Sequence, residues 1–121
     1  APLFYTWRDL ERGTAMLANL IDSLALPPAS RIAVQTEKSV EALMLYLAVL
    51  RAGHVFLPLN TAYTADEVEY FLGNATPRVM LCDATRANAL APVAARQGVA
   101  LLTLNAAKKE KRRFQNESQR Q

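Results

Sequence analysis

Residues 53–64 have the sequence GHVFLPLNTAYT, and this stretch decides the fold. Gly53 is expected to end the preceding helix, because glycine adopts the left-handed conformation that follows many helices without a Cβ clash. The apolar run at 55–59 has the length of a strand that is buried on both faces of a parallel sheet. Thr64 and Glu67 match the capping box that begins a helix. The stretch is therefore predicted to be a helix–strand–helix passage, with its strand at the centre of the sheet.

Strands and helices alternate along the rest of the chain. Apolar runs predict further strands at 31–35, 78–82 and 100–104, and the apolar residues 1–5 indicate a short edge strand. Helices are predicted from the cap Thr6 as far as Pro27, and at 40–52, 65–72 and 84–97. Elements that alternate at this spacing are typical of βαβ units with right-handed crossovers. The predicted fold class is α/β, with a mainly parallel sheet and flanking helices.

Short polar, glycine and proline signals predict where these helices begin and end. Ser39 is an expected N-cap, and Asp83 is expected to cap the last helix. The pair Gly73–Asn74 is expected to stop the third helix, as Gly98 stops the fourth. Pro92 lies inside the fourth helix, and it should kink that helix or split it into two short pieces.

Two of the predicted helices carry large apolar surfaces. The first has one stripe at helical spacing, made of Trp7, Leu10, Leu17, Leu20, Ile21 and Leu24. The helix at 40–52 is apolar nearly all round, so it should be buried on most sides. A chain of 121 residues does not readily supply that much covering. Self-association through the uncovered part of this helix, or through an open sheet edge, is therefore expected.

The composition indicates one small packed domain in a reducing compartment. Apolar residues make up 51% of the chain, and its longest uncharged apolar run, 42–50, is far shorter than the roughly 20 residues that cross a bilayer. No membrane association is therefore expected. Cys82 is the single cysteine and cannot form an internal disulfide, so a cytoplasmic location is expected.

The net charge of +3 comes from the end of the chain. Residues 107–121 carry six basic and two acidic side chains, a net +4, whereas residues 1–106 carry eight basic and nine acidic ones, a net −1. We interpret residues 1–106 as part of an α/β subdomain and residues 107–121 as a basic tail, solvated and disordered or an artefact. Nucleic acid is not the favoured partner of this tail, because Phe114 is its only large apolar residue.

Polar residues follow the second strand at its carboxyl end, the edge where open α/β sheets bind ligands. They are Asn60, Thr61 and Tyr63. His54 lies at the opposite end and is interpreted as structural, and Cys82, with no histidine in reach, as a small buried apolar side chain. The sequence has no glycine-rich phosphate loop and no spacing typical of metal ligands. The residues by themselves therefore assign no catalytic, cofactor-binding or metal-binding residue.

Several motifs resemble the N-terminal region of adenylate-forming acyl-CoA synthetases. The segment RAGHVFLPLN at 51–60 matches the pattern R-A-G-x-V-x-x-P-L-N of that superfamily, and YTADE at 63–67 matches Y-T-x-x-E. The segments VQTEKS at 34–39 and LPLNTAYT at 57–64 are most similar to the bacterial malonyl-CoA synthetases. The resemblance covers about residues 5–106.

The resemblance implies the first subdomain of the N-terminal domain of such a synthetase. The family binds ATP and magnesium, forms an acyl-adenylate and transfers the acyl group to CoA. Its phosphate loop, its adenine and ribose motifs and its C-terminal lysine have no counterpart here, so no site residue is carried over. The implied function is an N-terminal fragment of an acyl-CoA synthetase, with malonate as the expected acid and the rest of the synthetase as its partner, inactive alone. The alternative is a standalone α/β interaction module whose basic tail binds nucleic acid or an acidic partner.

Deleting residues 107–121 is expected to leave the fold intact, because solvated charge runs contribute only about a few tenths of a kcal/mol. The midpoint of thermal unfolding should change by no more than about 2–4 °C in a domain of this size. Melting curves of the full chain and of residues 1–106, followed by circular dichroism, measure this. A larger loss would mean that the tail packs against the rest of the chain, and salt-sensitive nucleic-acid binding lost with the tail would favour the alternative.

Overall fold

Four parallel strands form one sheet in the computed structural model, which describes residues 5–104. The elements are α1 (Trp7–Ser23), β1 (Arg31–Gln35), α2 (Val40–Arg51), β2 (Val55–Pro58), α3 (Ala65–Ala75), β3 (Val79–Cys82), the short 3-10 helix η1 (Ala84–Arg86), α4 (Ala87–Arg96) and β4 (Ala100–Thr103). The expected tail at 107–121 lies outside the described residues. So does the expected edge strand at 1–5, except for Tyr5, which is in no strand.

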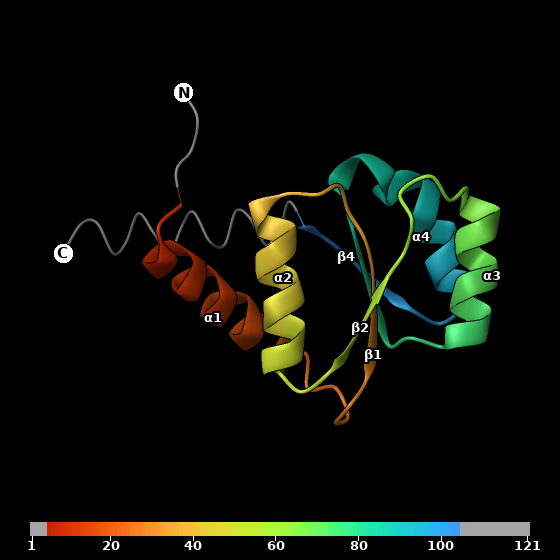
Figure 1. The fold of residues 1–121 in the computed structure, drawn as a ribbon. Coiled ribbons are helices and arrows are strands. Elements are labelled where there is room, and N and C mark those ends of the chain that lie inside the picture. The colour runs from red at the N-terminus through yellow and green to blue at the C-terminus, as the bar shows by residue number, and fades with distance from the viewer. Residues whose placement is uncertain (1–4, 105–121) are drawn as a thin grey trace.

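The strand order β2–β1–β3–β4 places β1 and β3 in the middle of the sheet. Ile32 of β1 lies opposite Phe56 of β2 and Val79 of β3, and Val79 lies opposite Ala100 of β4. Helices α1 and α2 cover one face of the sheet, and α3 and α4 cover the other (Figure 1). The predicted α/β class, with a mainly parallel sheet and flanking helices, is confirmed.

The side chains of β1 alternate between two separate cores. Ile32 and Val34 pack in the cluster that includes α1 and α2, whereas Ala33 packs in the cluster that includes α3 and α4. All four residues of β3 are buried. Parallel strands that are covered on both faces have no solvent side, which explains why β1 and β3 are apolar at almost every position.

The strand β2 lies at the edge of the sheet, so the predicted central position is wrong. Within the described residues it pairs with β1 alone, and Val55 is 42% exposed. Pro58 has no N–H donor, which suits a strand with one free edge. A short apolar run is compatible with a central or an edge position, and only its partners, which are distant in the sequence, distinguish the two.

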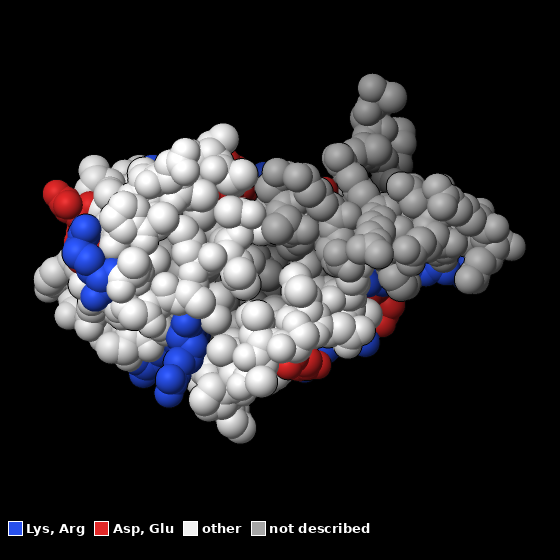
Figure 2. Space-filling view, turned by 180° about the vertical axis from the view of Figure 1, so that it is seen from behind, with Lys and Arg blue, Asp and Glu red and all other residues white. Residues whose placement is uncertain are grey.

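The described surface is largely uncharged when seen from behind. Its Lys, Arg, Asp and Glu side chains form separate small groups on this side (Figure 2). This view therefore offers no extended basic surface on the described part of the chain. Within residues 5–104, no helix combines the length and the hydropathy that are needed to span a membrane.

Helix α1 begins as predicted but buries less of its apolar stripe. The Thr6 hydroxyl accepts a hydrogen bond from the Asp9 amide, and the Asp9 carboxylate accepts one from the Thr6 amide, both at 3.1 Å. Leu17 is buried as expected, but Trp7 is 85% exposed and Leu20 is also exposed. The C-terminal end of α1 lies nearest to α2, whereas the first turn of α1 stands away from the sheet (Figure 1).

Helix α2 is covered on one side only. It begins at the predicted cap Ser39, whose hydroxyl accepts from the Ala42 amide at 3.0 Å, and ends before Gly53, which has the expected positive φ of 82°. The expectation that this helix is buried on most sides is wrong for the described residues, because its buried positions lie on one face. The buried positions are Met44, Leu45, Ala48 and Val49, and the exposed ones include Leu43, Tyr46 and Leu50.

Helix α3 continues to Ala75, so the predicted stop at Gly73–Asn74 is wrong. The helix ends instead at Thr76, which has a left-handed φ of 48°, and Pro77 follows. A Cβ atom at Gly73 would lie 3.3 Å from Oε1 of Gln97, at the end of α4. Close packing of the two helices therefore explains this glycine better than a helix end does.

The segment after β3 also differs from the prediction. The side chain of Asp83 makes no capping hydrogen bond, the short helix η1 follows, and α4 begins only at Ala87. Helix α4 then continues through Pro92 to Arg96 instead of splitting at the proline. Pro92 is exposed, so water can bind the carbonyl oxygen that lost its helical donor.

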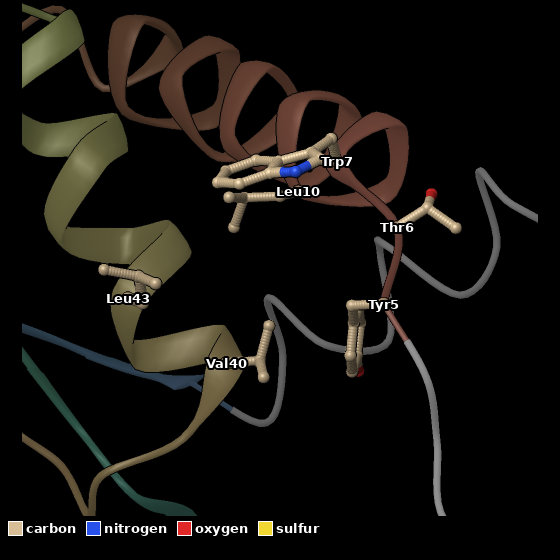
Figure 3. Close-up of a pocket in the computed structure, with 6 residues that line it drawn as sticks. All are labelled: Tyr5, Thr6, Trp7, Leu10, Val40 and Leu43. Atoms are coloured by element: carbon tan, nitrogen blue, oxygen red, sulfur yellow. The ribbon is translucent and has the colours of Figure 1, made fainter.

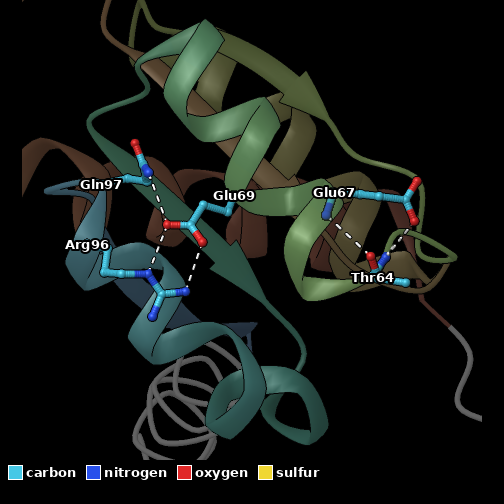
Figure 4. Close-up of polar contacts among 5 residues, drawn as sticks. All are labelled: Thr64, Glu67, Glu69, Arg96 and Gln97. Atoms are coloured by element: carbon cyan, nitrogen blue, oxygen red, sulfur yellow. Dashed lines mark hydrogen bonds and ion pairs between the residues drawn. The ribbon is translucent and has the colours of Figure 1, made fainter.

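An ion pair joins α3 to α4. Arg96 donates from Nε and Nη2 to the two carboxylate oxygens of Glu69 at 2.9 and 2.8 Å, and Gln97 Nε2 donates to Glu69 at 3.1 Å (Figure 4). These donors favour the charged carboxylate, and Arg96 contributes most to lowering the pKa of Glu69 to about 2. Figure 4 also shows the predicted capping box, in which Thr64 and Glu67 exchange hydrogen bonds at 3.2 and 3.3 Å.

The contribution of Glu69 to stability should depend on pH. Because its folded-state pKa lies below the ordinary value, the contribution is present above about pH 4.5 and is lost as the pH falls toward 2. Glu69→Gln should therefore lower the free energy of unfolding at neutral pH, and its difference from the unchanged chain should shrink through this window. Urea unfolding at a series of pH values measures the difference.

The matched control is Glu11→Gln, which removes a single contact of 3.3 Å to Arg51 between exposed side chains. Exposed single contacts contribute little, so this variant should stay close to the unchanged chain across the same pH series. A Glu69→Gln difference that does not change with pH would contradict the prediction, because it would show that the charge on Glu69 is not what stabilises the α3–α4 contact.

Candidate functional site

The carboxyl edge of the sheet carries a cleft between the loops that follow β1 and β2. Its volume is about 520 Å³. Asn60 and Thr61 lie at this edge as predicted, whereas Tyr63 lines a separate hollow with Tyr70 and Phe71. The cleft is lined by apolar residues from the strands and α2 and by polar residues from the two loops: Val34, Thr36, Glu37, Lys38, Ala42, Phe56, Pro58, Leu59, Asn60 and Thr61.

Two side chains hold the main chain of the loop after β2. Gln35 Nε2 donates to the carbonyl oxygen of Asn60 at 2.9 Å, and Arg86 Nη2 donates to the carbonyl oxygen of Tyr63 at 3.2 Å. Gln35 ends β1 and is buried, and Arg86 belongs to η1. Within the loop, the Asn60 side chain accepts from the Ala62 amide at 2.9 Å. The loop is therefore fixed from within and from two other segments.

The loop after β1 is held by a hydrogen bond to the residue that follows β3. The Glu37 amide donates to Oδ2 of Asp83 at 2.9 Å. An ionised acceptor makes such a bond stronger than one between neutral groups. Asp83 therefore acts between two loops rather than at the start of a helix, and the loops after β1, β2 and β3 are joined to one another.

Two buried polar atoms at this edge have no hydrogen-bond partner within the described residues: Gln35 Oε1, an acceptor, and Arg86 Nε, a donor. Gln35 lies opposite Cys82 in the β1–β3 register.

Cys82 is buried and His54 lies at the amino end of β2, as the sequence predicted. Cys82 is fully buried, and burial, reinforced by the Asp83 carboxylate, raises the pKa of its thiol, so the neutral form is favoured. His54 lies at the amino end of β2, where its Nδ1 accepts from the Ser30 amide at 3.2 Å. The only thiol and the only imidazole of the described residues therefore lie at opposite ends of the sheet. They cannot form a nucleophile–base pair.

The described residues provide no site for a metal ion. Nowhere in residues 5–104 do three or more His, Cys, Asp or Glu side chains come together in an arrangement that could hold one. The cleft carries one cation, Lys38, and one carboxylate, Glu37, on the same loop. These side chains can bind and orient a loop or a small polar group.

Gln35 and Arg86 were not predicted from the sequence as important residues of this edge. Gln35 gave a usable signal, since a polar residue that ends an otherwise apolar buried strand needs a partner. Arg86 gave none, because its acceptor is a main-chain carbonyl in a loop far away in the sequence.

The sequence pattern of the family described as AMP-binding enzyme matches residues 3–121. This chain belongs to the AMP-binding enzyme family. The match extends beyond residue 106, where the resemblance based on motifs ends. At the level of the family, the resemblance to adenylate-forming enzymes is confirmed.

Among solved structures of AMP-binding enzymes, MatB from Rhodopseudomonas palustris shares this architecture. Its apo form is 40% identical, with a TM-score of 0.78 over 85% of this chain and 22% of that chain. Its ATP-bound form is 42% identical, with a TM-score of 0.75 over 81% of this chain and 21% of that chain. The predicted fold, that of the N-terminal domain of MatB-like ligases, is confirmed.

Two curated proteins also match part of the chain. Phosphinothricin tripeptide synthetase PhsB from Streptomyces viridochromogenes is 37% identical over 76 residues, which are 63% of this chain and 6% of that protein. Oxalate–CoA ligase from Arabidopsis thaliana is 33% identical over 64 residues, which are 53% of this chain and 12% of that protein. The chain spans only a small part of the length of the proteins that it matches.

The loop after β1 should open more often when Asp83 is replaced by Ala, because the Glu37 amide loses its acceptor. Hydrogen exchange at the Glu37 amide should become about tenfold faster, because losing its bond to a charged group costs roughly 1.4 kcal/mol. Asp83→Asn keeps an acceptor oxygen and should retain most of the protection. The Ala62 amide, which is bonded within another loop, is the internal control in the NMR measurement. Equal exchange at Glu37 in both variants would contradict this role of Asp83.

Proposed function

We propose that this chain is the N-terminal segment of an acyl-CoA synthetase, which uses ATP to convert a carboxylic acid into an acyl-adenylate and then into an acyl-CoA. The observation that carries the proposal is the 40% identity to MatB over 85% of this chain. The ATP-bound form of MatB supports the use of ATP. Family membership alone does not distinguish an acyl-CoA synthetase from a peptide synthetase, because peptide synthetases such as PhsB match as well.

Malonate is the proposed acid. The two segments most similar to malonyl-CoA synthetases, at 34–39 and 57–64, are distant in the sequence but line the same cleft. Their contact gives a physical reason for the two segments to occur together, because each loop is shaped by the other. Oxalate–CoA ligase, another relative, is named for a second short dicarboxylic acid.

The proposed role of the segment is to build and hold part of the synthetase rather than to perform the chemistry. ATP, magnesium and CoA would bind to residues of the longer protein, since the family's phosphate loop has no counterpart in this sequence. The proposed partner is therefore the rest of the synthetase. The cross-linked loops at the carboxyl edge support this role, because three hydrogen bonds make the edge a fixed surface for neighbouring segments.

The alternative, an interaction module with a tail that binds nucleic acid or an acidic partner, has no observation in its favour. Residues 107–121 fall within the AMP-binding match. The Lys and Arg side chains of the described surface form separate groups in the view from behind (Figure 2). Nucleic-acid binding by a folded domain typically uses a continuous basic patch or stripe.

A hybrid enzyme tests the proposal. Residues 5–104 of this chain replace the matching segment of R. palustris MatB, and ATP–pyrophosphate exchange is measured with malonate, oxalate, acetate and alanine. We expect exchange with malonate, because the segment supplies structure and the MatB remainder supplies the phosphate-binding groups. The 121-residue chain alone should give no exchange with any acid, since preorganised donors around the transferred charge are missing.

The outcomes separate the parts of the proposal. A soluble, folded hybrid without exchange would contradict the assignment of this chain as a segment of a malonate-activating synthetase. Exchange by the isolated chain, free of any full-length enzyme, would contradict its proposed structural role. The longer protein that contains this segment should prefer malonate in the same assay, and a preference for an amino acid would instead identify a peptide synthetase.

A further inference from the structure

A buried histidine holds the loop that joins α1 to the sheet. This loop, residues 24–30, lies between α1 and β1 and carries no charged side chain. Its last residue, Ser30, donates a hydrogen bond from its amide to Nδ1 of His54 at 3.2 Å. His54 is buried and stands just before β2, so the bond connects two segments that are 24 residues apart. Because the ring nitrogen is the acceptor, the bond requires a neutral imidazole with its proton on Nε2.

Two main-chain hydrogen bonds lie beside this contact. The Ala29 amide donates to the carbonyl oxygen of Gly53 at 3.2 Å, and the Val55 amide donates to the carbonyl oxygen of Ser30 at 2.9 Å. A carbonyl oxygen does not change its charge between about pH 5 and 8, whereas a histidine side chain can. Of these three contacts, the one to His54 is therefore the one that can respond to pH in this range.

The loop is held in a conformation that its residues do not favour. Ala25 and Ala29 have positive φ values of 53° and 58°. The left-handed region is unfavourable for residues with a Cβ atom, and alanine has no polar side chain that could offset the cost with a local hydrogen bond. The surrounding contacts must therefore maintain both conformations, and the loss of one contact favours a relaxed loop.

Protonation of His54 would break its bond to the loop without supplying a new partner. An imidazolium has two N–H donors, so Nδ1–H would face the Ser30 amide, donor against donor. Within residues 5–104 no carboxylate forms an ion pair with His54. Arg31 and Arg51 make other contacts, to the Ala75 carbonyl oxygen and to Glu11. The charged side chains on the segments next to His54 are Asp22, Arg31, Arg51 and Arg78.

The end of α1 next to this loop is the end that packs in the core. Leu17 and Ile21, in the second half of the helix, are buried in the cluster shared with α2. Near the other end, a groove of about 390 Å³ lies between the two helices, with Trp7 on the α1 side and Leu43 on the α2 side (Figure 3). The loop therefore continues directly from the packed part of α1, so a change in the loop reaches that part of the helix.

We propose that the Ser30–His54 hydrogen bond makes the loop at 24–30 sensitive to pH. The neutral imidazole holds the loop against the start of β2. When Nδ1 takes up one proton from the solvent, the bond to the Ser30 amide breaks and Ala25 and Ala29 relax from their left-handed conformations. The C-terminal turn of α1 then opens more often. Loss of the proton restores the contact.

Hydrogen exchange measured by NMR on the full 121-residue chain tests this proposal between about pH 5 and 8, with the ring nitrogens of His54 observed in the same samples. Each rate is divided by the rate of an unstructured peptide at the same pH. We expect the protection of the Ser30 amide to fall at least about tenfold as the ring is protonated. The Ala25 amide, which bonds the Asp22 carbonyl oxygen at 3.0 Å, should lose protection with it. The Val99 amide is the internal control, because its acceptor is a carbonyl oxygen at the start of β4.

Two variants make the test specific. His54→Asn places an acceptor, Oδ1, as many bonds from the main chain as Nδ1 and does not titrate, so the Ser30 amide should stay protected throughout. His54→Ala removes the acceptor, so Ser30 should be weakly protected at every pH. Ser30 protection that stays constant while the ring is protonated, an imidazole that stays neutral down to about pH 5, or an equal pH dependence in His54→Asn would each overturn the proposal.

Discussion

The parallel pairing of strands on both sides of β1 is the constraint on which the structure depends. Two parallel neighbours cannot be joined by a tight turn, so each connection must cross a face of the sheet. The chain leaves β1 toward β2 on one side and then returns past β1 to β3 on the other. This reversal places α2 and α3 on opposite faces, as right-handed crossovers require. It also explains why β1 and β3 are apolar and why the two cores are separate.

The same reversal is the place where open α/β sheets commonly bind ligands, because the loops at the carboxyl ends of the two middle strands diverge there. In this chain the Glu37–Asp83 hydrogen bond spans that gap, since the two residues follow β1 and β3. The open cleft lies one position away, between β1 and β2. The gap between the middle strands is thus bridged by a contact that the fold itself supplies.

Features encoded by neighbouring residues could be predicted from the sequence, and features that depend on distant partners could not. The caps Thr6, Ser39 and Thr64 are local hydrogen bonds, so their residues and spacing suffice. The edge position of β2 depends on which strands lie beside it, and Gly73 is explained by its closeness to Gln97 in another helix. At the site, the polar edge was predicted, but the bonds to main-chain carbonyls were not. The family was recognised from the specific residues of short motifs. Periodicity and composition do not contain that information.

The way in which the loop after β2 is held has a consequence for how this region can vary. Gln35 and Arg86 bind carbonyl oxygens, which every amino acid has, so these two hydrogen bonds do not depend on the side chains at positions 60 and 63. Tyr63 can therefore be exchanged while its carbonyl remains in place. The backbone at this position and the side chain that lines the hollow beside Tyr70 and Phe71 are separable, so related proteins could present a different side chain there on the same backbone.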